Sequence, residues 1–158
     1  MRHPLVALFT IPLAILVCIA LVQAAATYNG TVSGAQTASP ESGSVAVNLN
    51  ATGDLPGMVK VTLRHEGTNV NGGTWTMTVL PPNADATSSE TGTLTGTISG
   101  GSVTVDANGT ITAVSSVQLT VQSGTGQYSA INSGNGTLSL SADAENSSKL
   151  GGPLVLDF

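Results

Sequence analysis

From Thr27 onward, apolar and polar residues alternate along most of the chain with a period of two. This period sends successive side chains to opposite faces of a β-strand. An apolar face opposite a polar face is typical of antiparallel sheets that pack one side on a core. The predicted inward rows are Val45, Val47 and Leu49; Val59, Val61 and Leu63; Trp75, Met77 and Val79; Leu94 and Ile98; Val103 and Val105; Ile111, Ala113, Val117, Leu119 and Val121; Leu138, Leu140 and Ala142; and Leu154, Leu156 and Phe158.

Turn sequences separate these rows. Asn-Gly pairs, which suit two-residue hairpins because both central residues need positive φ, begin at Asn29, Asn71, Asn108 and Asn135. The clearest predicted hairpin is 106–109, and Gly100-Gly101 is a second turn. We expect loops over residues 34–44, from Pro81 to about Glu90, and over 143–152. The pattern therefore predicts an all-β fold, an antiparallel β-barrel or β-sandwich of about 8–10 strands, after an N-terminal signal helix.

Residues 1–26 have the layout of a secretory signal. Arg2 and His3 form a polar head, Leu5 to Val22 is apolar apart from Thr10, and 24–26 is a small-residue cleavage site. Cleavage there would leave residues 27–158 as a single all-β domain. The alternative is an uncleaved anchor, because an apolar run of about 18 residues is long enough to span a bilayer.

The composition narrows the function. Charged residues are 8% of the chain, against about a quarter in an average protein. Four Lys and Arg against nine Asp and Glu leave no basic patch, so we expect no nucleic-acid partner. The one cysteine, Cys18, lies in the signal. This Thr- and Ser-rich composition is typical of extracellular bacterial β-proteins, which predicts a secreted, periplasmic or cell-surface location.

Three residues are weak pocket candidates: His65, Trp75 and Tyr128. His65 shares the predicted inward face of 59–63 near a strand end; it could act as an acid or base, but we expect a structural role. Trp75 heads an apolar row and is expected to anchor the core. Lys60 and Arg64 occupy the opposite face of the His65 strand, where we expect them to protect a sheet edge.

No nucleophile elbow, phosphate loop or metal-ligand cluster is recognisable in the sequence. We therefore expect no catalytic residues, no metal and no cofactor, and a protein that is not an enzyme.

Residues 124–130 (Gly-Thr-Gly-Gln-Tyr-Ser-Ala) and 134–140 (Gly-Asn-Gly-Thr-Leu-Ser-Leu) resemble a pattern of dirigent and allene-oxide-cyclase-like β-barrel proteins. There, a Gly-Thr-Gly, an aromatic and small residues precede a Gly-rich turn and a strand. The resemblance covers about 20 residues of simple composition. It implies an eight-stranded antiparallel barrel with a central apolar cavity. Some members guide a cyclisation or a radical coupling, but the acidic and aromatic pocket residues of a working cyclase are not recognisable here.

Three functions remain open. The first is a secreted non-enzymatic β-domain, structural or ligand-binding, with a small apolar ligand or a surface partner. The second is a cavity barrel for a small ligand, as the resemblance implies. The third is a small outer-membrane barrel, because Leu154, Leu156 and Phe158 imitate the closing strand of such barrels.

Overall fold

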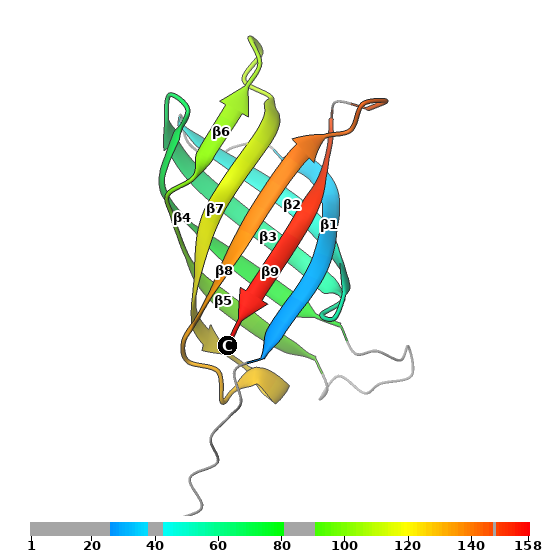
Figure 1. The fold of residues 1–158 in the computed structure, drawn as a ribbon, viewed down its shortest axis with the longest axis vertical. Coiled ribbons are helices and arrows are strands. Elements are labelled where there is room, and N and C mark those ends of the chain that lie inside the picture. Colours follow the sequence, from blue (N-terminus) through cyan, green and yellow to red (C-terminus); the bar gives the residue numbers. More distant parts are fainter. Residues whose placement is uncertain (1–25, 38–42, 81–90, 147) are drawn as a thin grey trace, which may run out of the picture.

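A computed structural model describes residues 26–37, 43–80, 91–146 and 148–158. Its strands all belong to one antiparallel sheet (Figure 1). A single 3-10 turn, η2 (Gly126–Tyr128), is the only helical element within these ranges. The strands are β1 (Thr27–Thr37), β2 (Ser44–Gly53), β3 (Gly57–Glu66), β4 (Asn69–Val79), β5 (Gly92–Ser99), β6 (Ser102–Val105), β7 (Ile111–Gly124), β8 (Gly134–Ala142) and β9 (Lys149–Asp157).

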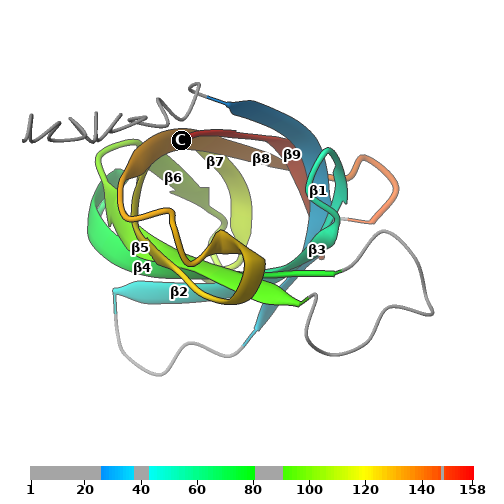
Figure 2. The same ribbon diagram turned by 90° about the horizontal axis from the view of Figure 1, so that it is seen from below.

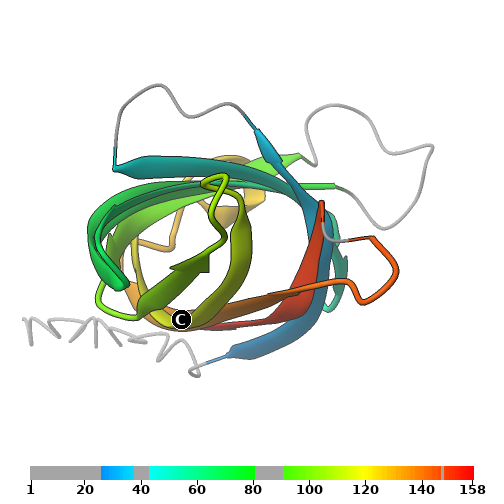
Figure 3. The same cartoon turned by 90° about the horizontal axis from the view of Figure 1, so that it is seen from above.

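The sheet closes into a barrel. Strands pair mostly in chain order, and β1 also pairs with β9. The short β6 continues the line of β5 in the wall, where it pairs with β7 and, at Ser102, with β4. Figure 2, seen along the barrel, shows the closed ring and the β7–β8 connection at one end. Figure 3 shows the β6–β7 hairpin at the opposite end. The all-β prediction is confirmed, and of its two architectures the barrel is the one that forms.

Side chains fill the barrel interior. Leu63, Met77, Leu94, Ile111 and Leu138 are fully buried, and they come from five different strands. An eight-stranded barrel is just wide enough to be filled in this way. The facing-out positions are polar, as along β4, where Thr74, Thr76 and Thr78 are exposed. The alternation along the sequence thus becomes an apolar inside and a polar outside.

Closure corrects the prediction for Lys60 and Arg64. Both side chains are exposed, as alternation predicts, but their strand β3 pairs with β2 on one side and β4 on the other. A closed barrel has no edge here to protect. The two cations therefore lie on a fully paired outer wall.

Three of the four Asn-Gly hairpin predictions are wrong, because those pairs lie inside β1, β4 and β8. In a barrel, glycine also permits neighbouring backbones to approach closely. A Cβ on Gly30 would lie 2.6 Å from the carbonyl oxygen of Thr52, and one on Gly136 would collide with the carbonyl of Val155. The predicted 106–109 hairpin forms between β6 and β7. The predicted turn at Gly100-Gly101 is wrong: the chain does not reverse there, because β5 and β6 pair with β7 in one continuous register, Ser99 with Gln118 and Ser102 with Ser115. In the hairpin, Asp106 Oδ1 accepts hydrogen bonds from the backbone N–H groups of Thr110 (2.9 Å) and Asn108 (2.8 Å).

The predicted loops are too long. β1 runs to Thr37 and β2 begins at Ser44, and β9 begins at Lys149, because Ala35 pairs with Lys149 across the β1–β9 ladder. Residues 38–42, 81–90 and 147 lie outside the described residues. So do residues 1–25 of the predicted signal, which spans residues 1–26. No helix within the described ranges is both long and apolar enough to cross a membrane.

Two positions leave their predicted inward rows. On β7, Val114 is buried while Ala113 is only half-buried, because the register with β8 shifts between Val114 and Val117. Ser116 in this bulge has a φ of 51°, and its N–H donates to Ser139 Oγ at 3.0 Å. Val105 is exposed, next to a second register shift at the end of β6. Bulges of this kind re-aim side chains, which a strict period of two does not anticipate.

Candidate functional site

The β7–β8 connection lies at one end of the barrel, and the motif at 124–126 shapes its start. Gly126 adopts a φ of 59°, which favours glycine, and η2 follows directly. Thr125 ties the connection to β5: its N–H donates to the carbonyl of Thr93 (2.8 Å), and its Oγ1 accepts from the N–H of Thr93 (3.2 Å). The connection is thereby held against the wall of the barrel.

Tyr128 ends η2 and packs back over two glycines. A Cβ on Gly92 would lie 2.6 Å from the Tyr128 ring, and one on Gly124 would collide with the Tyr128 carbonyl. Burial raises the pKa of the Tyr128 phenol, and the charge of an ionised Tyr28 raises it further. The hydrogen bond from Gln127 Nε2 to the Tyr128 hydroxyl (3.1 Å) acts in the opposite direction. Tyr28 lies at the same end of the barrel, where it lines a pocket together with Ala130 and Ile131 of this connection.

Tyr28 and Phe158 form an aromatic pair beside this connection. Ala26 and Phe158 exchange two backbone hydrogen bonds (2.9 and 3.0 Å), which extends the β1–β9 ladder by one step. Tyr28 pairs with Leu156, so Phe158 is its diagonal neighbour on the inward face. The ring centroids are 5.2 Å apart with the planes tilted by 50°. Both rings lie one layer beyond the packed core.

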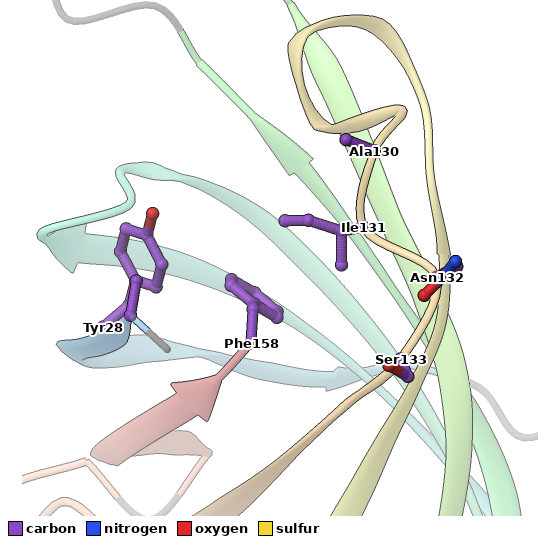
Figure 4. Close-up of a pocket in the computed structure, with 7 residues that line it drawn as sticks. Tyr28, Ala130, Ile131, Asn132, Ser133 and Phe158 are labelled. Atoms are coloured by element: carbon purple, nitrogen blue, oxygen red, sulfur yellow. The ribbon is translucent and has the colours of Figure 1, made fainter. Parts of the chain in front are cut away.

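A pocket of about 240 Å³ opens between this pair and the connection (Figure 4). Its lining residues are Ala26, Tyr28, Ala130, Ile131, Asn132, Ser133 and Phe158. Ile131 is positioned by two backbone hydrogen bonds: its N–H donates to Tyr128, and its carbonyl accepts from Gly124, both at 2.9 Å. None of these lining side chains carries a formal charge. The pocket thus combines aromatic and aliphatic walls with the neutral polar groups of Asn132, Ser133 and the Tyr28 hydroxyl.

The pocket does not continue into the barrel as a wide cavity. Behind Tyr28 lies a space of only about 10 Å³, bordered by Leu55, Met77 and Leu156 among others. That is about the space one water molecule needs. Tyr28 lines both spaces, and the small one leaves no room for a ligand deeper in the barrel.

Most of the few aromatic residues of the described domain lie at this end of the barrel. Aromatics are 3% of the sequence, and only four follow residue 26. Three of these four, Tyr28, Tyr128 and Phe158, lie here, partly buried and packed against the core. We call this region, Tyr28, 125–133 and Phe158, the aromatic end. Alternation alone did not reveal it, because its three parts come from separate segments of the sequence. The scarcity of aromatic residues was the available signal.

Positive side chains are distributed unevenly between the two ends of the barrel, whereas acidic side chains lie at both ends. Glu66, Asp106, Asp143 and Glu145 lie at the end opposite Tyr28 and Phe158. Asp54 lies at the aromatic end, where its Oδ2 accepts the backbone N–H of Asn29 at 2.9 Å, and the exposed Asp157 pairs with Thr27. Arg64 and Lys149 lie toward the opposite end, opposite Ser44 and Ala35 in their ladders. Lys60 lies midway along β3. Among the described residues, the charges at the aromatic end are therefore acidic.

The structure does not bring the three sequence candidates together. His65 lies at the far end of β3, half-buried, with its Nδ1 2.9 Å from the carbonyl of Gly67, to which it donates. Trp75 is 2% exposed inside the barrel, and its Nε1 donates to the carbonyl of Thr120 at 3.3 Å. Its predicted burial in the core is confirmed. Tyr128 alone lies at the aromatic end.

Within the described ranges, no three His, Cys, Asp or Glu side chains are grouped so that they could hold a metal ion. No protein-family model, curated protein or solved structure matches the chain.

Proposed function

We propose that this chain is an extracytoplasmic, non-enzymatic β-barrel domain that binds a small, mainly apolar ligand at its aromatic end. The observation that carries the proposal is the pocket of about 240 Å³ beside the Tyr28–Phe158 pair, where three of the four aromatics after residue 26 meet. Ligand sites are typically concave and mostly apolar, with a few polar groups that orient the ligand. The pocket lies just below the usual size range of such sites, so its ligand is small.

The packed interior favours a ligand site at the end of the barrel rather than in a central cavity. The side chains of Leu63, Met77 and Leu94 pack inside the barrel and have no exposed surface. A dirigent-like cyclase would need its substrate inside the barrel. The motif at 124–126 instead shapes the connection that borders the end pocket.

The polar outer wall favours this proposal rather than the alternative of an outer-membrane barrel. A barrel in a bilayer turns apolar side chains outward and polar ones inward. Here the arrangement is reversed, and the large exposed apolar side chains among the described residues are Met58, Leu80 and Val105. The extracytoplasmic location rests on the signal pattern in residues 1–26 and the low charge content. N-terminal sequencing of the exported protein tests it, with Thr27 expected as the first residue.

Ligand binding is tested by two-dimensional NMR of the purified protein against a library of small neutral and charged fragments. Binding fragments should shift the amide signals of Tyr28, Ile131 and Phe158 first. Phe158→Ala should weaken binding at least about tenfold, because it removes one aromatic wall. Val105→Ala is the matched control: it truncates an exposed apolar side chain at the other end of the barrel and should leave binding unchanged. Fragments that shift only signals elsewhere would contradict the proposal.

A further inference from the structure

We infer that the ligand of the aromatic end is a small alkylated ammonium ion; this inference rests on the proposed function. Two features of the pocket point to this class. One is the pair of tilted aromatic rings, and the other is the sign of the charges around them. Each feature alone is compatible with other ligands, whereas together they select an apolar cation.

The rings offer the right kind of surface. The face of an aromatic ring carries partial negative charge, which attracts a cation placed within about 6 Å of the ring centre. Tyr28 and Phe158 are tilted by 50° rather than stacked in parallel, and both line the pocket. Figure 4 shows both rings beside the pocket, with Ile131 extending toward them from the connection. An ammonium ion with methyl or other alkyl substituents satisfies both the ring faces and the aliphatic wall.

The surrounding charges favour a cation over an anion or a strongly acidic ligand. The chain has a formal net charge of −5, and Asp54 and Asp157 lie at this end of the barrel. The cations Arg64 and Lys149 lie toward the other end, which also carries acidic residues, so the aromatic end is distinguished by having no cation rather than by having more acids. Within the described residues, no positive side chain lines the pocket and none is present to pair with an anion there. Excess negative charge attracts a positive ligand over roughly 10 Å at moderate salt.

The uncharged lining also discriminates among cations. No carboxylate side chain lines the pocket, so a bare metal ion or an unsubstituted ammonium ion would lose its water without gaining a charged side chain as a partner. An alkylated ammonium ion spreads its charge over its substituents and is weakly hydrated, so it loses less hydration free energy when it enters the pocket. The pocket volume of about 240 Å³ limits the ion to a small head group rather than a long chain.

The test compares choline with 3,3-dimethylbutan-1-ol, a neutral molecule of nearly the same shape in which carbon replaces nitrogen. Both are titrated into the purified protein at low salt and followed by NMR shifts at Tyr28, Ile131 and Phe158. Choline should bind roughly 3- to 30-fold more tightly than the neutral alcohol, the ratio expected from cation–π attraction. Raising the salt concentration should reduce this preference, because screening weakens the attraction of Asp54 and Asp157 for the cation.

Two variants of Phe158 separate the ring from its volume. Phe158→Leu keeps an apolar side chain without a π face, so the preference for choline should fall toward parity while the neutral alcohol binds nearly as before. Phe158→Tyr keeps the ring and should retain the preference. Thermal midpoints of both variants show whether the barrel remains folded. A separate experiment adds phosphatidylcholine vesicles to the protein with bound choline. If the vesicles displace choline, the ammonium ion can come from a lipid head group; if they do not, the ligand is a free ion. Both results support an alkylated ammonium ion as the ligand.

The outcomes also separate this inference from the proposed function. Equal binding of choline and its neutral analogue, or binding of neutral fragments alone at these signals, would overturn the inference and leave the ligand site in place. Unchanged preference in Phe158→Leu would overturn it as well. A pocket whose signals respond to neither compound nor to any library fragment would overturn both.

Discussion

The contact between Trp75 and Gly96 makes a sharp test of how the core is packed. The two residues are opposite each other in the β4–β5 ladder. A Cβ on Gly96 would lie 2.6 Å from Trp75 Nε1 and would collide with the carbonyl oxygen of Thr120. That carbonyl accepts the hydrogen bond from the indole N–H. Gly96→Ala therefore inserts a methyl group between a buried donor and its acceptor.

The expected loss follows from two terms. Forcing an extra methyl group into a packed core costs about 1–3 kcal/mol. Losing the indole hydrogen bond adds about 0.5–1.5 kcal/mol. Gly96→Ala should thus lower the free energy of unfolding by roughly 2–4 kcal/mol. Trp75→Ala should cost about 3–5 kcal/mol, the usual range for deleting a buried aromatic side chain.

Urea denaturation followed by far-ultraviolet circular dichroism measures both variants with the same probe. Gly151→Ala is the matched control, because a Cβ there meets only ordinary contacts, the nearest at 3.4 Å. It should change stability by less than about 1 kcal/mol. In a double-mutant cycle, Gly96→Ala should cost less in a Trp75→Phe background, where no indole N–H is displaced. A loss for Gly96→Ala no larger than that for Gly151→Ala would refute the packing described here.

Three further results are expected. The pKa of Tyr128 should be above the ordinary value near 10, as measured by tyrosinate absorbance. Because the folded state then keeps this proton to a higher pH than the unfolded state, the stability of the protein should fall as the pH rises past about 10. Tyr128→Phe should reduce that alkaline loss of stability, as measured by thermal midpoints. The hydrogen bonds from Thr110 and Asn108 lower the pKa of Asp106, so the ionised carboxylate stabilises the folded state above about pH 4, and this stabilisation is lost as the pH falls through the lower pKa of the folded state. The difference in stability between the protein and Asp106→Ala should therefore narrow in acid, and a constant difference would contradict this. At Ser116, whose φ of 51° disfavours β-branched residues, Ser116→Val should cost about 1–2 kcal/mol in urea midpoints whereas Ser116→Gly should be tolerated.

The sequence by itself determined the strands and most of their inward faces. The pleat of a strand is a local property, so a period of two places Leu63 or Met77 inward whatever the strand pairs with. The same reasoning identified Trp75 as a core residue and the hairpin at 106–109. It also identified His65 as a residue near the end of its strand.

The tertiary structure decided which strands are neighbours and what the glycines do. Whether Lys60 lies on an edge depends on the pairing of β3 with β4 and on the closure of β1 against β9, which joins the two ends of the described domain. The Asn-Gly pairs within strands have the composition of turns, and only the backbone of the adjacent strand shows why glycine is needed there. The bulge at Ser116 likewise depends on the register with β8.

The candidate site belongs wholly to the tertiary level. Tyr28 comes from the first strand, Tyr128 from the β7–β8 connection and Phe158 from the residue after β9. No local pattern relates them, because each is an ordinary aromatic in its own segment. Closure of the barrel places β1 beside β9, and the hydrogen bonds of Thr125 and Ile131 hold the connection against the same end. The pocket exists because backbone pairing between distant segments, rather than any motif along the chain, sets these side chains next to one another.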